Sequence, residues 1–334
     1  MQESSWQKRI SRAKTLAHQY PFASEILNFY CAIAGFQQSL FQRIEGAASS
    51  SNGATRELGI KSSSSVIPSE AELPHSGDDS AQSGDPVLRI PGRAARSEAG
   101  RRRNSAEVAD NAIVAGPPEL STLLASFPQF LTLVEKHGPS NLAEAARHLR
   151  AAPSNTQTQL LNDFWDARST SSDVSEIERH TTNKSPSNEF FARAFLQPYA
   201  EFLRMRAEIS SNGHAVSLCP FCGRKPGLAV LRPLGDGGQR RLVCSFCLAE
   251  WEFRRIICAS CGEEDHKNLP VYTSDQFPHV RVDCCDRCRR YLKTIDLTKT
   301  GLAEPIVDEL ATIPLDLWAR ERGYEKLELN LLQL

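Results

Sequence analysis

Apolar residues between Ser5 and Glu45 recur at spacings of three and four, which is the period of a helix with one buried face. Pro21 interrupts the pattern, because proline lacks the backbone N–H and its ring clashes with the preceding turn. We therefore predict a helical hairpin over residues 1–45, with Cys31 as a small buried side chain in its second helix. The apolar positions are Trp6, Ile10, Ala13 and Leu16, then Phe22, Ile26, Phe29, Ile33, Phe36 and Leu40.

Residues 46–116 differ in composition from the chain on either side. They contain no aromatic residue, and they include a serine run at 62–65 and an arginine run at 101–103. Such a segment buries too little apolar surface to offset the entropy cost of ordering it. We predict a flexible linker or insertion with one short ordered stretch at 86–91, and a solvated arginine run rather than a contact for an anionic partner.

The helical period resumes after this segment, and residues 117–213 are predicted to form a helical domain that packs with residues 1–45. Its aromatic residues at helical spacing indicate a core rather than a cofactor pocket. A polar loop is expected at 168–187. The predicted helices cover residues 120–134 with a bend near Pro128, 142–149, 156–165 and 190–209.

From His214 onwards, strand patterns and glycine turns replace the helical period. One β-hairpin is predicted in residues 214–257 and a second in residues 258–300, and the segment 301–334 is predicted to hold one final helix that ends near Gly323. The expected strands are residues 227–234, 240–243, 251–257, 269–273, 279–283 and 291–295.

Cysteine pairs of the form Cys-x-x-Cys flank both predicted hairpins and use eight of the ten cysteines in the chain. Two such turns can present four thiolates to one ion in a tetrahedron, so the spacing predicts two metal sites. Pairing along the chain closes shorter loops than an interleaved pairing. The predicted ligands are Cys219, Cys222, Cys244 and Cys247 in the first module, and Cys258, Cys261, Cys285 and Cys288 in the second.

Four thiolates suit zinc or iron, and tetrahedral sulfur geometry does not distinguish the two ions. A filled site has no vacant coordination position, so we expect a structural role rather than catalysis, with redox activity as the alternative. Cys284 is expected to be a bystander next to its neighbouring ligand. The basic residues around the second module are expected to be electrostatic partners of the metal centres: Arg254, Arg255, Arg287, Arg289, Arg290 and Lys293.

The formal net charge is −1, so the chain as a whole offers no electrostatic argument for binding nucleic acid or membranes. No signal peptide, membrane span, phosphate-binding loop, dinucleotide fingerprint or hydrolase motif is visible, and nothing pairs a nucleophile with a base. We predict a non-enzymatic cytoplasmic protein with no catalytic or cofactor-binding residues other than metal ligands. In a reducing cytoplasm, paired thiols bind metals more often than they form disulfides. His266 and His279 are expected to be surface or loop residues.

Several strings around the cysteine pairs resemble the FdhE family, the accessory proteins of formate dehydrogenase. The resemblance covers residues 218–330 and is specific because four cysteine pairs occur in the family's order with its flanking residues. The strings are Cys219–Pro226, Arg241–Trp251, Arg255–Cys261, Cys285–Lys293 and the tail Asp308–Tyr324.

The resemblance implies a cytoplasmic helper that binds the catalytic subunit of formate dehydrogenase before twin-arginine export and carries rubredoxin-like sites with iron. The fold class expected is α+β, with an N-terminal all-α helical domain, two tandem rubredoxin-like or zinc-ribbon β modules and a C-terminal helix. Trp251 is a candidate partner contact or a core residue. The alternatives are a nucleic-acid-binding double zinc ribbon and a redox carrier with sulfur-bound iron; the sequence leaves the oligomeric state open.

Overall fold

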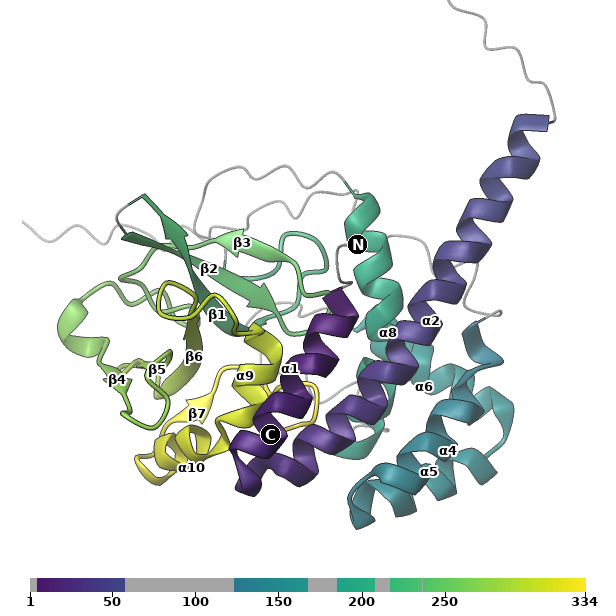
Figure 1. Ribbon diagram of the computed structural model, residues 1–334, viewed down its shortest axis with the longest axis horizontal. Helices are drawn as coiled ribbons and strands as arrows, with labels where there is room; N and C mark the ends of the chain where they lie inside the picture. Colours follow the sequence, from purple (N-terminus) through teal and green to yellow (C-terminus); the bar gives the residue numbers. More distant parts are fainter. Residues whose placement is uncertain (1–4, 58–122, 168–184, 208–216, 236) are drawn as a thin grey trace, which may run out of the picture. The chain divides into compact units, whose positions relative to one another are not determined.

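The computed structural model describes residues 5–57, 123–167, 185–207, 217–235 and 237–334 (Figure 1). Most of the predicted linker, the short ordered stretch at 86–91 and the arginine run at 101–103 lie outside these residues. Most of the polar loop predicted at 168–187 also lies outside them.

The first two helices are α1 (Ser5–Gln19) and α2 (Ser24–Glu57), separated by a single 3₁₀ turn at Pro21–Ala23. The break at Pro21 is therefore confirmed. The two helices run antiparallel, since the ring of Trp6 near the start of α1 lies 6.3 Å from the ring of Phe41 in α2. The end predicted for the second helix was wrong, because α2 continues past residue 45. No proline interrupts the sequence between 24 and 57, so the backbone can keep its hydrogen bonds through the serine-rich stretch.

The remaining helices of the N-terminal part surround α8, which is buried continuously from Phe190 to Phe202. Phenylalanines from three helices meet there, with the ring of Phe195 at 4.8 Å from Phe127 and 6.3 Å from Phe36. The helix expected over residues 120–134 is divided: Leu123 and Leu124 are helical, a turn follows, and α4 begins at Phe127, with Pro128 in its first turn, where the missing N–H needs no partner. The helices are α4 (Phe127–His137), α5 (Ser140–Ala151), α6 (Ser154–Asp166) and α8 (Pro186–Arg206).

The C-terminal part contains one twisted sheet, with the strand order β3-β2-β1-β6-β5-β4. Strand β7 pairs with the first residues of β6. Strand β1 pairs with the same edge of β6, nearer the C-terminal end of that strand. The strand predicted at 251–257 is much shorter, because the chain leaves the sheet after Glu252 and turns towards the third cysteine pair. The strands are β1 (Pro226–Leu234), β2 (Gly237–Cys244), β3 (Glu250–Glu252), β4 (Val271–Thr273), β5 (Val280–Cys284), β6 (Arg290–Asp296) and β7 (Glu325–Lys326).

The two hairpin modules are not separate sheets. Strand β1 of the first module pairs in parallel with β6 of the second, with Ala229 opposite Thr294 and Leu231 opposite Asp296. A parallel pair needs a long connection between its strands, and here strands β2 to β5 lie in that connection. The modules therefore share one set of strand hydrogen bonds, and both hydrophobic clusters at the sheet contain residues from the two modules, such as Ala229 with Leu292 and Val230 with Ile295.

Two short helices follow the sheet where one was predicted. Helix α9 (Pro305–Ala311) packs on β1, β6 and α1, and helix α10 (Ile313–Glu321) begins after Thr312. Pro314 lies in the first turn of α10, where a missing N–H is tolerated, whereas in the middle of a continuous helix it would break a hydrogen bond.

Ion pairs connect α1 to both halves of the structure. The guanidinium of Arg9 donates to both carboxylate oxygens of Glu201 on α8 at 3.0–3.1 Å. The guanidinium of Arg12 donates to Asp308 on α9 at 2.6–3.0 Å, and Nε2 of His279 lies 2.8 Å from the same carboxylate. Burial opposes ionisation of Asp308, but these donors outweigh it and hold the pKa of the carboxyl group below its usual value. Helix α1 is thus part of the support of the sheet as well as of the helical bundle.

Candidate metal centres

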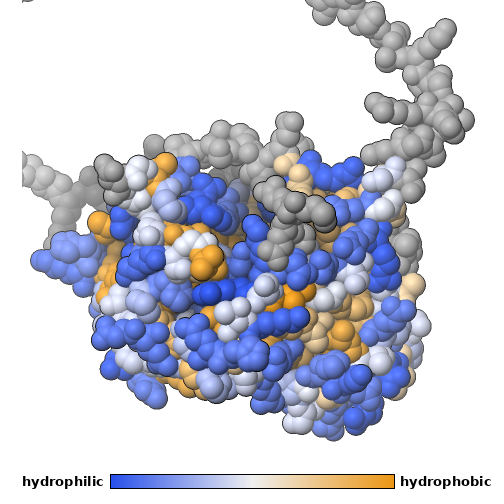
Figure 2. Space-filling view, viewed as in Figure 1, coloured by the Kyte–Doolittle hydropathy of each residue, from blue (hydrophilic) through white to orange (hydrophobic). Residues whose placement is uncertain are grey.

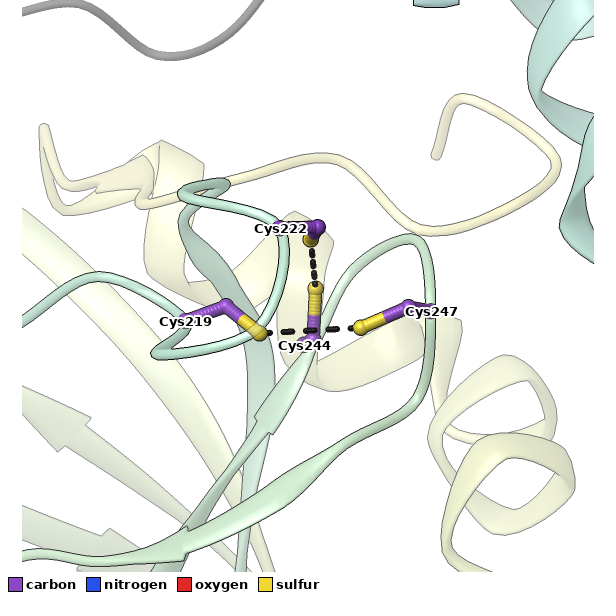
Figure 3. A group of neighbouring side chains, drawn as sticks. All are labelled: Cys219, Cys222, Cys244 and Cys247. Atoms are coloured by element: carbon purple, nitrogen blue, oxygen red, sulfur yellow. Dashed lines mark hydrogen bonds between the residues drawn. The ribbon is translucent and has the colours of Figure 1, made fainter. Parts of the chain in front are cut away.

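The first cysteine cluster lies where the β1–β2 hairpin leaves the sheet. Cys219 and Cys222 precede β1, Cys244 ends β2, and Cys247 is in the turn that follows (Figure 3). Their sulfur atoms all lie within 4.8 Å of one another, with Cys219 Sγ at 3.6 Å from Cys247 Sγ and Cys222 Sγ at 3.3 Å from Cys244 Sγ. The structure thus brings together the first predicted set.

The second cluster has the same construction at the ends of β5 and β6. Here Cys258 Sγ lies 3.7 Å from Cys288 Sγ, and Cys261 Sγ lies 3.7 Å from Cys285 Sγ. All four sulfur atoms again lie within 4.8 Å of one another. The chain therefore pairs its cysteine turns in sequence order, as the shorter loop closure favours.

The backbone of each turn follows one pattern. In the first turn the N–H of Gly223 donates to the carbonyl of Cys219 at 2.9 Å, and the N–H of Cys219 donates to Arg224 at 2.8 Å. The residue after the second cysteine has positive φ in all four turns, namely Gly223 (73°), Leu248 (56°), Gly262 (73°) and Arg289 (58°). Leucine and arginine adopt this conformation at a cost of about 1–2 kcal/mol, so the tight turn is kept even without glycine.

These distances fit a metal ion and not a disulfide. Zinc–sulfur bonds of about 2.3 Å in a tetrahedron place the sulfur atoms about 3.8 Å apart, whereas a disulfide needs about 2.05 Å. Backbone N–H groups also point at the sulfurs, from Phe246 to Cys244 Sγ at 3.4 Å and from Ser260 to Cys258 Sγ at 3.3 Å. Such donors stabilise thiolates, as the ligands of zinc and iron require.

Burial opposes ionisation of several of these thiols, although at Cys288 hydrogen bonds, led by that from the backbone N–H of Arg290, outweigh burial and lower the pKa. Burial raises the pKa of the Cys247 thiol and of the Cys258 thiol above the usual value. A divalent ion at the centre reverses this preference, because its charge stabilises the deprotonated sulfurs. When bound, such an ion would cross-link the two turns of a module.

The two clusters differ in their exposure. In the first, Cys219, Cys244 and Cys247 are buried, and in the second, Cys261 is exposed. Helices cover the first cluster: the ring of Phe246 contacts Phe164 at 5.2 Å, and Gln197 on α8 donates to the carbonyl of Phe246 at 3.1 Å.

Arg224 also connects the first cluster to the helices. Its guanidinium lies 4.1 Å from the ring centre of Phe164 and 4.8 Å from that of Phe246. It also donates to the backbone carbonyl of Phe164. The first cluster therefore connects the sheet to α6 and α8, whereas the second leaves Cys261 exposed to solvent.

This difference predicts the order of metal release. With a chelator in excess, about half of the bound metal should leave in a fast phase from the second cluster, because solvent reaches Cys261 directly. Alkylation followed by mass spectrometry should show Cys261 modified well before Cys247. In a guanidinium-unfolded control, both should react together. Earlier modification of Cys247 in the folded protein would contradict this assignment.

The other cysteines stay outside both clusters. Cys284 is buried in the core beside the second cluster, and burial raises the pKa of its thiol to about 12. Cys31 is partly buried in α2, with its sulfur 3.9 Å from the carbonyl of Ile10. Trp251 is 7% exposed and belongs to the core, which is the second of the two roles considered for it. His266 is exposed as expected, but His279 is buried and bonded to Asp308, because α9 covers that end of β5.

Most of the basic residues expected to neutralise the metal centres pair with carboxylates instead. Arg254 contacts Glu264 at 2.7 Å, and Arg287 contacts Glu263 at 3.3 Å. Arg289 and Arg290 contact Asp286 and Glu325, each at 3.0 Å. These carboxylates lie close in sequence or on the adjacent strand, so the basic side chains reach them easily.

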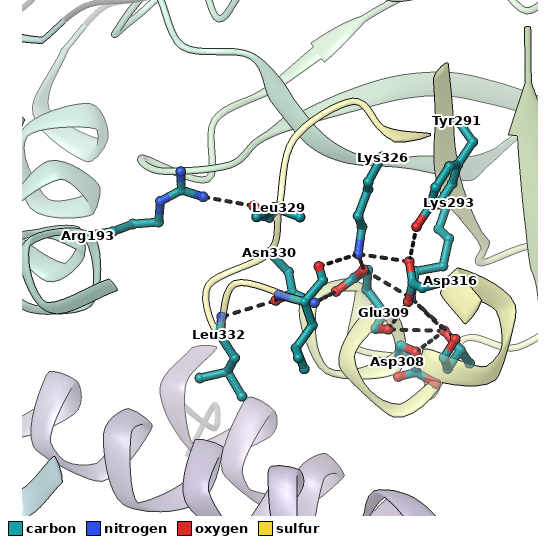
Figure 4. A network of polar contacts seen from close by, with 12 residues as sticks. Arg193, Tyr291, Lys293, Asp308, Glu309, Asp316, Lys326, Leu329, Asn330 and Leu332 are labelled. Carbon is teal, nitrogen blue, oxygen red and sulfur yellow. Dashed lines mark hydrogen bonds and ion pairs between the residues drawn. The ribbon is translucent and has the colours of Figure 1, made fainter. Parts of the chain in front are cut away.

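Lys293, the last of that group, belongs to a buried network that no sequence pattern predicted (Figure 4). Its ammonium lies 3.0 Å from Glu309 and 2.6 Å from Asp316. Lys326 from β7 contacts the same two carboxylates, and Tyr291 donates to Asp316 at 2.8 Å. The network joins β6, β7, α9 and α10 and is supported by Thr312 and by Asn330, which donates to Glu309 at 3.0 Å. Two positive and two negative side chains balance each other there.

Family models and known proteins match this part of the chain. A model described as "FdhE, central domain" matches residues 218–255, and one described as "FdhE, C-terminal domain" matches residues 256–333. A protein of Aquifex aeolicus named "Protein FdhE homolog" is 29% identical over 215 residues, which are 64% of this chain and 71% of that protein. A protein of the same name from Shewanella oneidensis is 35% identical over 118 residues, 35% of this chain and 39% of that protein.

The arrangement of elements also matches a solved structure. The crystal structure of the FdhE protein from Pseudomonas aeruginosa superimposes with a TM-score of 0.56 at 19% identity, over 100% of this chain and 98% of that one. At this identity the likeness concerns the fold alone. It agrees with the α+β fold class predicted from the sequence, with helices first, the two cysteine clusters on a sheet, and helix after the sheet.

Proposed function

This chain belongs to the FdhE family, the accessory proteins of formate dehydrogenase, and from that premise we propose that it binds the catalytic subunit of the enzyme in the cytoplasm before export. The observation that carries the proposal is that the chain forms two four-cysteine clusters, whose Cys-x-x-Cys pairs occur along the sequence in the same order as in the family. None of the helices in the described part of the chain combines the length and the apolar character that a membrane span requires.

We further propose that the eight cysteines ligate two ions, one in each cluster, either iron or zinc: Cys219, Cys222, Cys244 and Cys247, then Cys258, Cys261, Cys285 and Cys288. Four sulfurs complete a tetrahedral ion and leave it no position for a substrate, which supports a non-enzymatic role. Each ion would cross-link the two Cys-x-x-Cys turns of its module, which the short strands alone would stabilise only weakly. Metal analysis of anaerobically purified protein should find two equivalents, and a red colour would favour iron.

Direct binding to the catalytic subunit tests the partner. Purified wild-type protein should form a complex with the unexported subunit in size-exclusion chromatography and titration calorimetry, under anaerobic or aerobic conditions. A parallel titration with duplex DNA at low salt tests for a nucleic-acid-binding ribbon, which would show strongly salt-dependent affinity. Absence of any complex with the subunit in both atmospheres would refute the proposal.

A further inference from the structure

Large apolar side chains are exposed at separate places on the surface, which is hydrophilic over much of the face shown in Figure 2. Two of them, Ile256 (58% exposed) and Val271 (51% exposed), line the same cavity of about 130 Å³. The cavity lies next to the second cysteine cluster, since Cys258 and Cys285 also form part of its wall. This is the place where exposed apolar surface and a concave site coincide.

The size of the cavity suits one large apolar side chain. An apolar cavity of about 150 Å³ accommodates a benzene molecule, which is the size of a phenylalanine ring. The apolar wall includes Leu269 and Leu292 as well as Ile256 and Val271. The lining also carries charged side chains: Arg240 is paired with Asp283 at 3.2 Å, and Arg290 is paired with Glu325 at 3.0 Å.

Val271 also begins β4, which is an edge strand of the sheet. The N–H of Cys284 donates to the carbonyl of Pro270 at 3.0 Å, so residues 270 and 272 direct their backbone groups towards β5. The N–H and C=O groups of Val271 and Thr273 consequently point away from the sheet. An extended segment of another chain can form hydrogen bonds with them as a further strand.

A strand added to the free edge of β4 would have side chains on the face of the sheet where the cavity lies. Side chains of residues opposite each other on neighbouring strands lie on the same face of a sheet, so a residue paired with Val271 would point to the cavity side. Arg255 at the cavity wall is exposed, and none of the described carboxylates lies within ion-pair distance of it. It is therefore available for an acidic residue next to the apolar one.

We propose that an extended segment of the client polypeptide adds to the free edge of β4 and inserts one large apolar side chain into the cavity, with an acidic neighbour at Arg255. This inference rests on the proposed function, because the client is the immature catalytic subunit. It also assigns a task to the second cluster: Cys258 and Cys285 fix the loop and the strand end that form the cavity wall. Loss of that metal would deform the docking site.

Hydrogen exchange of the metal-loaded wild-type chain tests the geometry without any substitution. The amides of Val271 and Thr273 have no partner within the sheet and should exchange rapidly in the free protein. With the purified catalytic subunit bound, their exchange should slow by about tenfold or more, because each acquires a hydrogen-bond acceptor.

Two substitutions test the same site by affinity. Thr273→Pro removes an outward-facing N–H and no hydrogen bond between β4 and β5, and Val271→Asp places a charge at the cavity wall. Each should weaken binding of the catalytic subunit by about 30-fold, the size typical of an interface hot spot. Leu302→Asp, at a residue that is 81% exposed and outside the cavity, is the matched control and should bind like wild type. Metal content and thermal unfolding should match wild type in all three.

The outcomes separate the two proposals. A wild-type complex in which the Val271 and Thr273 amides remain unprotected overturns the docking site and leaves the proposed function standing. If the folded Thr273→Pro and Val271→Asp proteins bind the subunit with wild-type affinity, the docking site is likewise overturned and the proposed function stands. Failure of the wild-type protein to bind the subunit at all overturns the proposed function and the docking site together.

Discussion

Replacing Cys285 with serine is expected to remove one of the two metal equivalents and to disorder the β5–β6 end of the sheet, whereas Cys284→Ser should keep both equivalents. The two residues are adjacent and both are buried, with 1% and 3% of their surface exposed, but only the sulfur of Cys285 belongs to a cluster. A structural zinc site contributes folding free energy on the order of 10 kcal/mol, far more than one buried thiol. The comparison therefore isolates ligation from packing.

The same substitution in the first cluster should have wider consequences. Cys247→Ser should also remove one equivalent, but here the turn that carries Phe246 contacts α6 and α8. Because the helices lose these contacts, unfolding should include the interface between helices and sheet. Metal analysis by mass spectrometry and near-ultraviolet circular dichroism measure the two effects. Retention of both equivalents in Cys247→Ser and Cys285→Ser would refute the ligand assignment.

Replacing Lys293 with methionine is expected to lower the free energy of unfolding by about 3–5 kcal/mol, the usual cost of removing one partner from a buried ion pair. Lys293 is fully buried, and its ammonium also donates to the backbone carbonyl of Glu309 at 2.6 Å. Methionine fills a similar volume but leaves that carbonyl and Asp316 with fewer donors. Denaturant unfolding measures the loss. As a control, Arg147→Met at the exposed pair with Glu135 should leave the unfolding midpoint close to that of wild type, because solvent screens this pair.

The pH dependence of stability gives a second readout for the Lys293 variant. Burial would raise the pKa of Asp316, but the ammonium groups of Lys293 and Lys326 outweigh it and lower the pKa below the usual value. A lowered pKa contributes stability above about pH 4, and the contribution disappears as pH falls through the folded-state pKa. Lys293→Met should reduce this acid-side loss relative to wild type. An unchanged loss together with unchanged stability would show that the network does not hold the sheet.

The sequence alone determined the features that depend on short spacing. Two thiols separated by two residues must lie in one turn, and a hairpin between two such turns brings all four together, so both clusters could be predicted by residue number. Helical periodicity and Pro21 likewise located the first two helices, and alternation with glycine turns located the two hairpins. Each of these signals depends on residues close together in sequence, so the conformation of the local backbone is enough to produce the feature.

Only the tertiary structure decided how these pieces join. The parallel pairing of β1 with β6, the enclosure of the first cluster by α6 and α8, and the exposure of Cys261 all depend on contacts between residues far apart in sequence. Lys293 illustrates the physical reason: a lysine on a strand suggests solvent, and it is stable in the core only because β7, α9 and α10 bring charged partners to it. Neither hydrophobic period nor motif spacing encodes such long-range compensation.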